Sequence, residues 1–237
     1  MLVDFIRIQL IRLFKSRQTY VFMAVSAIFF AWAYDVFAVI SVEYDVKCAT
    51  AIHFVFKEFL IFVAIIGTVL ELPFHKERFA VNLGKNIVTS PLYILSEILS
   101  LGIVAFVFSA LNTAFELVMI NIVSDITPDY FSVFINSAGQ MWIAILTGYL
   151  TGKFFKRLRL SVFVYIVFIL ASNFIYRFIE KSSVAPFLVL LNSSYIENSI
   201  TGKLCWLYVM EFVVIITAIF YPLAILISHK KIREDRK

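Results

Sequence analysis

Long apolar runs separated by short charged segments extend along most of the chain. An α-helix needs roughly 20 apolar residues to cross a bilayer, and six runs reach that length. They lie at about residues 19–41, 51–71, 91–116, 131–152, 160–179 and 204–228. The pattern predicts an all-α membrane protein with six transmembrane helices in a single domain of residues 1–237. The spans then occupy residues 18–228, and residues 229–237 form a tail.

Residues 1–17 have the periodicity of an amphipathic helix. At about 100° per residue, the apolar side chains share one arc, and the charged ones lie opposite, interrupted by Ile8 and Ile11. The apolar arc holds Leu2, Val3, Ile6, Leu10, Leu13 and Phe14, and the charged side holds Asp4, Arg7, Arg12 and Lys15. The pattern predicts an interfacial helix that lies on the membrane. The alternative is an inward extension of the first span.

The composition agrees with a lipid environment. Hydrophobic residues make up 62% of the 237 residues and charged residues 16%, whereas a soluble domain has about 45–50% apolar and about 25% charged residues. Because the charged residues gather between the apolar runs, we expect a lipid bilayer to surround those runs.

Basic residues are distributed unequally over the predicted loops. Sixteen Lys and Arg residues lie in the amino-terminal segment, the second and fourth loops and the tail, and four lie in the other loops. This bias predicts a multi-pass protein with both termini in the cytoplasm. It also explains the net charge of +5, and no basic face of the kind that binds nucleic acid is expected.

The sequence contains no motif typical of an enzyme or a metal site. His53, His75 and His229 have no second histidine one turn away, and the Gly-Lys pairs lack the other residues of a P-loop. We therefore expect no catalytic residue, no metal site and no cofactor in this chain. Cys48 and Cys205 both lie near the predicted outer face, where two unpaired thiols and a disulfide are both open.

Ionisable side chains within the predicted spans are candidates for function, because a charge inside a bilayer is unfavourable unless it is paired or hydrated. The candidates are Asp35, Lys57, Glu58, Glu97 and Glu211, and Glu116 lies at the end of the third span. Two interpretations stay open. The charges either pair structurally and reach the interface, or they line a water-filled pathway.

Small residues recur at four-residue spacing on the fourth predicted span. Ala144, Gly148 and Gly152 share one helix face, and such a stripe allows two helices to approach closely. The stripe predicts either a contact within the molecule or a contact with a second copy.

The second loop, residues 72–87, has the pattern of a short amphipathic helix. Charged residues His75 to Arg78 precede Phe79, Leu83 and Ile87, which recur at four-residue spacing. A cytoplasmic helix of this kind between the second and third spans is suited to docking on a soluble partner. The alternative is a solvated connector.

This loop and the residues after it resemble a segment of the ABC-2 type exporter permeases. In that family the segment commonly reads Glu-x-x-x-Gly-Thr, a spacer, and then Ser-Arg-x-x-(Ile/Phe)-Tyr-x-(Ser/Gly)-Lys. Here the comparable places are taken by Glu77 to Phe79, Asn82 to Lys85, Ser90, Tyr93, Ser96 and Glu97. Pro91 replaces the usual Arg, Glu97 replaces the usual Lys, and the Gly-Thr pair is absent. The size and the plan of the chain resemble the small permeases of bacteriocin and lantibiotic immunity exporters.

The resemblance implies a permease subunit of the bacterial cytoplasmic membrane. Such a subunit pairs with a second copy or a sister permease and with ABC ATPase subunits, which bind ATP and Mg. The cargo is an amphipathic peptide, such as a bacteriocin, lantibiotic or toxin peptide, or a lipophilic compound. The segment that couples to the ATPase then includes Phe74, His75, Lys76, Glu77, Arg78, Phe79, Leu83 and Lys85.

Two other functions stay open. The first is an ion-coupled secondary carrier that uses the intramembrane acids and needs no ATPase. The second is a membrane protein that transports nothing and serves in immunity, assembly or sensing.

Overall fold

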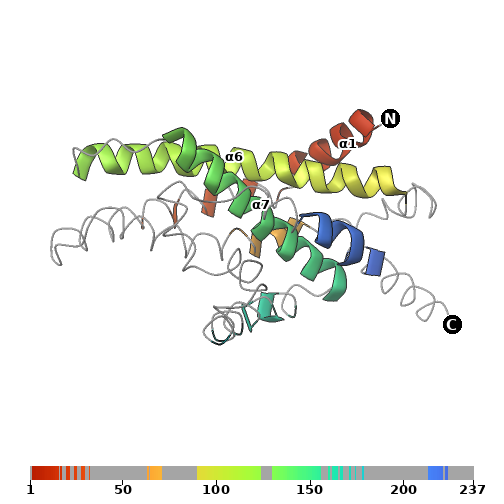
Figure 1. The fold of residues 1–237 in the computed structure, drawn as a ribbon. Helices are drawn as coiled ribbons and strands as arrows, with labels where there is room; N and C mark the ends of the chain where they lie inside the picture. The colour runs from red at the N-terminus through yellow and green to blue at the C-terminus, as the bar shows by residue number, and fades with distance from the viewer. Residues whose placement is uncertain are drawn as a thin grey trace.

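The described part of the chain is helical. The computed structural model describes residues 2–15, 90–123 and 130–155, together with individual helical residues within 17–32, 63–70, 160–178 and 213–223. The helices are α1 (Leu2–Lys15), α6 (Pro91–Val123) and α7 (Tyr130–Phe155), followed by a short π-helical turn, η2 (Ile216–Phe220). Figure 1 shows α1 lying against the Pro91 end of α6, and α7 crossing beside α6.

A hydrogen-bonded cap fixes the start of α6. The Ser90 hydroxyl accepts a hydrogen bond from the Tyr93 backbone N–H at 3.3 Å, and the Ser90 carbonyl accepts from the backbone N–H groups of Tyr93 and Ile94 at 3.1 Å. Pro91 is the first helical residue, a position where its missing N–H removes no helical bond. The chain that leaves the second loop therefore enters α6 at a defined point.

The length and composition of α6 suit a membrane-spanning helix. Its 33 residues extend about 50 Å at 1.5 Å per residue, which exceeds a hydrocarbon core of about 30 Å. Within the described residues, its segment Pro91–Ala114 is the one helix that is long and apolar enough to cross a membrane. One or both ends of α6 would therefore extend beyond the hydrocarbon of a bilayer.

α6 and α7 pack side by side and run antiparallel. Near the Pro91 end of α6, the Trp142 indole N–H donates to the Ile98 carbonyl at 3.2 Å. Farther along, the Ser109 hydroxyl donates to the Phe134 carbonyl at 2.8 Å and lies 2.5 Å from the Ser137 hydroxyl. Such polar contacts between helices hold the packing register where neither lipid nor water is available as a partner.

Two glycines allow other helices to pack closely against α7. Gly67 lies against the backbone of α7, and Gly102 lies against the Trp142 side chain. A Cβ atom at Gly67, in the helical residues 65–70, would meet the Ile145 carbonyl oxygen and lie 3.0 Å from the Tyr149 backbone nitrogen. A Cβ atom at Gly102 on α6 would lie 3.0 Å from the Trp142 ring. The packing at Gly67 is the closer of the two, because the backbone of residues 65–70 lies against the backbone of α7 there.

The predicted third and fourth spans are confirmed as helices. α6 continues seven residues past the predicted end at residue 116, and α7 extends over residues 130–155 instead of 131–152. Residues of the other four predicted spans are helical wherever the structure describes them. The number of six spans stays a prediction.

The predicted amino-terminal helix is confirmed as α1, and most of the predicted apolar arc lies on its inward side. Gln9 and Leu13 are buried against the rest of the protein, and Leu13 belongs to the main hydrophobic core. The arc residues Leu2, Ile6, Leu10 and Phe14 are partly buried, whereas Val3 and the two isoleucines of the charged side, Ile8 and Ile11, are exposed. The sequence pattern therefore indicated the inward side of α1, but it could not show which helices that side contacts.

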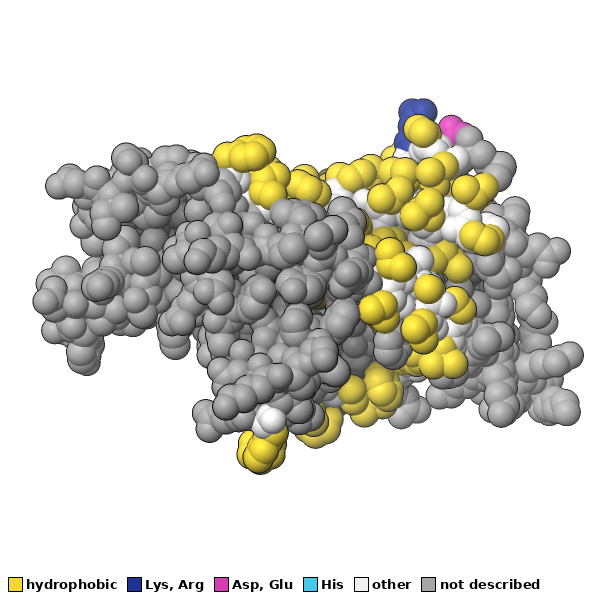
Figure 2. All heavy atoms as spheres, viewed as in Figure 1, with side chains coloured by type: hydrophobic (Ala, Val, Ile, Leu, Met, Phe, Trp, Pro, Cys, Tyr) yellow, Lys and Arg dark blue, Asp and Glu magenta, His cyan; other side chains and the backbone are white. Residues whose placement is uncertain are grey.

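Hydrophobic side chains cover much of the described surface (Figure 2). On α6 the exposed large hydrophobic residues follow helical spacing and include Leu92, Leu95, Ile103, Phe106, Val107 and Leu111. A soluble monomer rarely exposes so continuous an apolar stripe, and lipid is a suitable solvent for it.

Candidate functional site

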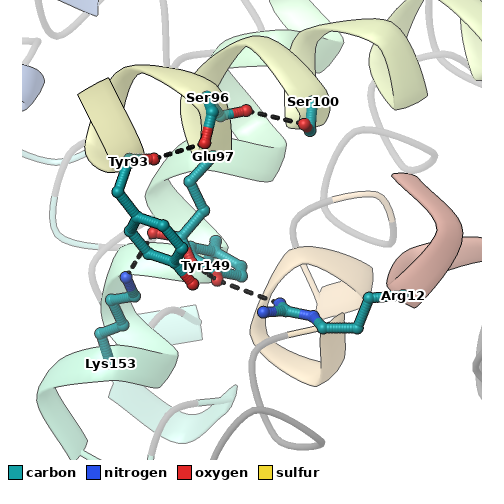
Figure 3. A network of polar contacts seen from close by, with 7 residues as sticks. All are labelled: Arg12, Tyr93, Ser96, Glu97, Ser100, Tyr149 and Lys153. Carbon is teal, nitrogen blue, oxygen red and sulfur yellow. Dashed lines mark hydrogen bonds and ion pairs between the residues drawn. The ribbon is translucent and has the colours of Figure 1, made fainter. Parts of the chain in front are cut away.

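Six side chains from three helices meet at the Pro91 end of α6, and we call them the polar cluster. They are Gln9 and Arg12 of α1, Tyr93 and Glu97 of α6, and Tyr149 and Lys153 of α7. Figure 3 shows five of them, all except Gln9, directed toward one another from the three helices.

A buried ion pair between α6 and α7 lies at the centre of the polar cluster. The Lys153 Nζ atom donates to Glu97 Oε2 at 2.7 Å, and the side chains of Lys153 and Glu97 are only 8% and 3% exposed. Tyr149, one turn before Lys153 on α7, donates its hydroxyl hydrogen to Glu97 Oε1. Both carboxylate oxygens of Glu97 are therefore engaged. A buried ion pair needs this kind of satisfaction to offset its loss of hydration.

Tyr149 contacts every charged member of the polar cluster. The Lys153 ammonium lies 5.1 Å from the centre of the Tyr149 ring, which is a cation–π geometry. On the other side, Arg12 Nη2 donates to the Tyr149 hydroxyl oxygen at 3.4 Å. One phenol therefore links a cation on α1 to the ion pair between α6 and α7 (Figure 3).

The surroundings of Arg12 preserve its positive charge. Burial opposes that charge, but the Tyr149 oxygen and the Glu97 carboxylate outweigh burial and raise the pKa of Arg12 above its usual value. Arg12 therefore stays protonated at every pH at which a protein is ordinarily studied, and its contact with Tyr149 does not titrate.

Some polar groups of the cluster are not satisfied by the described residues. Gln9 is 1% exposed and Tyr93 2% exposed, yet both polar atoms of the Gln9 side chain and the Tyr93 hydroxyl have no hydrogen-bond partner in the described part of the chain. Each unsatisfied buried group costs about 1–3 kcal/mol. The ring of Tyr93 packs edge-on against Phe5 with centroids 5.9 Å apart. Leu13, Phe5 and Arg12 therefore hold α1 in place.

The serines of α6 near the cluster are satisfied within their own helix. The Ser96 hydroxyl donates to the Tyr93 carbonyl at 2.7 Å, and the Ser100 hydroxyl donates to the Ser96 carbonyl at 2.7 Å (Figure 3). Ser96 is one of the residues that carry the resemblance to ABC-2 permeases, and its hydroxyl donates to the backbone of its own helix here.

Among the predicted intramembrane candidates, the structure describes the surroundings of Glu97. It is paired with Lys153, as the structural interpretation of these charges predicted. Asp35, Lys57, Glu58 and Glu211 lie outside the described residues. The same holds for the predicted coupling residues Phe74, His75, Lys76, Glu77, Arg78, Phe79, Leu83 and Lys85.

The predicted small-residue stripe lies on α7 and is buried. Ala144, Gly148 and Gly152 all face protein and not solvent. The close helix approach that the structure shows on α7 involves Gly67 against the backbone of Ile145 and Tyr149. Contact with a second copy stays a prediction.

Sequence reasoning missed most of the polar cluster. Lys153 was expected in the fourth loop, just beyond a span ending at residue 152, but α7 continues to Phe155 and buries it. The signal that could have found it is its one-turn spacing from Tyr149, combined with an acid inside the preceding span, Glu97, that needs a cationic partner. Arg12 was expected on the charged, solvent-facing side of α1.

Within the part of the chain that the structure describes, no three His, Cys, Asp or Glu side chains gather as metal ligands would. The contacts of the polar cluster that the structure shows are an ion pair and hydrogen bonds that join α1, α6 and α7.

Comparison with known proteins adds no relative. No family model matches the chain, and no curated protein matches it. The resemblance to ABC-2 permeases therefore depends on the residues named for it.

Proposed function

We propose that this chain is the membrane-spanning permease subunit of an ATP-binding cassette exporter. Six spans cross the cytoplasmic membrane with both termini inside, and residues 72–87 form a coupling helix that contacts a separate ATPase. The ATPase binds ATP and Mg, and the permease pairs with a second copy or a sister chain. The cargo is an amphipathic peptide of the bacteriocin or lantibiotic kind, or a lipophilic compound.

The placement of the polar cluster is the observation that best supports this proposal. α6 begins at Pro91, only a few residues after the proposed coupling helix, and its first two turns carry Tyr93 and Glu97. Glu97 contacts Lys153 and Tyr149 of α7, and Tyr149 contacts Arg12 of α1. A displacement of residues 72–87 would therefore reach three helices at once.

The energetics of the ion pair favour movement of these three helix ends as a unit. Separating a buried Glu97 from Lys153 would leave an uncompensated charge in a low-dielectric surrounding, at about 3–5 kcal/mol. Tilting α1, α6 and α7 together avoids this cost. A displacement of the capped start of α6 by the ATPase would then move α1, α6 and α7 together, as an alternating-access exporter requires.

The docking role of the 72–87 segment is tested by charge reversal. In the assembled transporter, the triple variant Lys76→Glu/Glu77→Lys/Arg78→Glu should lose export, because docking depends on the charges of the segment. The matched control reverses Arg233, Glu234 and Arg236 of the tail in the same way, which gives the same change in net charge. We expect the control to keep export. Copurification of the ATPase and coupled ATP hydrolysis are the measurements, and normal coupling with the first variant would refute the docking role.

Two other functions make different predictions. An ion-coupled carrier should move substrate down a pH gradient when the chain is reconstituted alone, but the engagement of both oxygens of Glu97 gives this function less support. A protein for immunity or assembly without transport should form a stable partner complex and show no substrate flux.

A further inference from the structure

The docking of α1 leaves one of its faces open. α1 turns Gln9 and Leu13 into the protein and holds Arg12 against Tyr149. The opposite side is exposed, and we call it the outward face of α1. It consists of Val3, Asp4, Arg7, Ile8, Ile11 and Lys15, and the next described residue, Arg17, is exposed as well.

The outward face combines large apolar side chains with basic ones. Val3 is 74% exposed, Ile8 41% and Ile11 44%. Arg7, Lys15 and Arg17 supply three positive charges against the one carboxylate of Asp4. In Figure 2 the basic side chains at this end of the molecule lie beside hydrophobic ones. A helix face that combines apolar and basic side chains in this way is typical of helices that lie at a membrane interface.

We propose that the outward face of α1 binds the anionic lipid headgroups of the cytoplasmic leaflet. Ile8 and Ile11 enter the boundary between headgroups and acyl chains, while Arg7 and Lys15 extend to phosphate oxygens. Basic residues at this surface attract anionic lipids through the negative potential of the leaflet. The inference rests on the proposed function, because it assumes that the Pro91 end of α6 lies at the cytoplasmic surface.

A lipid surface fits the outward face better than an acidic protein would. Arg7 lies before Ile8 and Ile11, and Lys15 and Arg17 lie after them, so basic residues flank an exposed apolar pair, which suits a layer of headgroups above acyl chains. The exposed apolar stripe of α6 next to α1 also suits lipid. Because Arg12 connects α1 to Tyr149, headgroups that bind the outward face also hold the polar cluster in place.

The test measures lipid preference of the full-length chain without any ATPase. The probe is phosphatidylglycerol titrated into the protein in neutral detergent, with phosphatidylcholine as the neutral lipid. Since each basic residue near the surface contributes about 1 kcal/mol, the variant Arg7→Gln/Lys15→Gln should bind phosphatidylglycerol at least about tenfold more weakly and phosphatidylcholine unchanged. The variant Arg233→Gln/Arg236→Gln, with the same loss of charge in the tail, is the control.

The outcomes separate the occupants of the outward face. A selective loss in the α1 variant supports the proposal. Equal phosphatidylglycerol binding by the α1 variant, the control and the unmodified chain overturns it, and so does a loss that appears equally in the control. Self-association or ATPase binding that depends on Arg7 and Lys15, with lipid preference unchanged, also overturns it. The docking test on residues 76–78 is independent of this result, so either proposal can fail alone.

Discussion

Glu97 and Lys153 are 56 residues apart in the sequence, yet they form a buried ion pair. Their sequence contexts gave different signals. Glu97 lies inside a long apolar run, so its need for a partner was predictable from the physics of a charge in lipid. Lys153 lies among other basic residues that suggest a solvated loop. The structure shows that α7 extends to Phe155 and that the Lys153 side chain on it is buried.

Removal of one member of this ion pair is the clearest test at the scale of residues. We expect Lys153→Met to lower the free energy of unfolding by about 3–5 kcal/mol, because the Glu97 carboxylate stays buried without its cation. The double variant Glu97→Gln/Lys153→Met should lose less than the sum of the single variants. Denaturant-induced unfolding in detergent measures both quantities.

A control for this cycle comes from α1. Lys15 is exposed, so Lys15→Met should change the free energy of unfolding by less than about 1 kcal/mol. Strict additivity of the effects at Glu97 and Lys153 would show that the two groups do not interact in the native protein.

At the scale of elements, apolar length predicted the helices well, but it did not predict which helices contact one another. The runs at residues 91–116 and 131–152 became α6 and α7, because a long apolar run in lipid has no alternative that satisfies its backbone. The apolar arc of α1 lies on its inward side, and Leu13 of that arc packs in the core. The residues that decide that face, Phe5 and Arg12, act through partners on α6 and α7 that no local pattern contains.

The close approach of residues 65–70 to α7 gives a prediction at this scale. We expect Gly67→Ala to destabilise the protein by about 1–3 kcal/mol, because its Cβ would collide with the backbone of Ile145 and Tyr149, which cannot move locally. The Gly102→Ala substitution should destabilise it less, because the Trp142 side chain can shift. The comparison is a thermal unfolding series in one detergent, and a larger effect at Gly102 would show that the α6–α7 contact is the tighter one.

At the scale of the whole molecule, the sequence predicts that lipid surrounds the helices, but it does not predict which helix ends contact one another. Composition and charge bias predict a multi-pass protein with its termini inside, and α6 has the length and composition that this requires. The polar cluster that joins α1, α6 and α7 was not predictable, because it depends on which helix ends meet. The coupling role proposed for residues 72–87 depends on a separate ATPase.

The proposed coupling to an ATPase requires residues 72–87 to lie in the cytoplasm. An Asn82→Cys variant with Cys48→Ser and Cys205→Ser carries a single thiol in this segment, and a Ser194→Cys variant in the same background places it in the last predicted outer loop. A membrane-impermeant maleimide should label the Ser194→Cys protein in intact cells and the Asn82→Cys protein only after the cells are permeabilised. Labelling of the Asn82→Cys protein from outside intact cells would contradict the orientation and, with it, the proposed coupling to an ATPase.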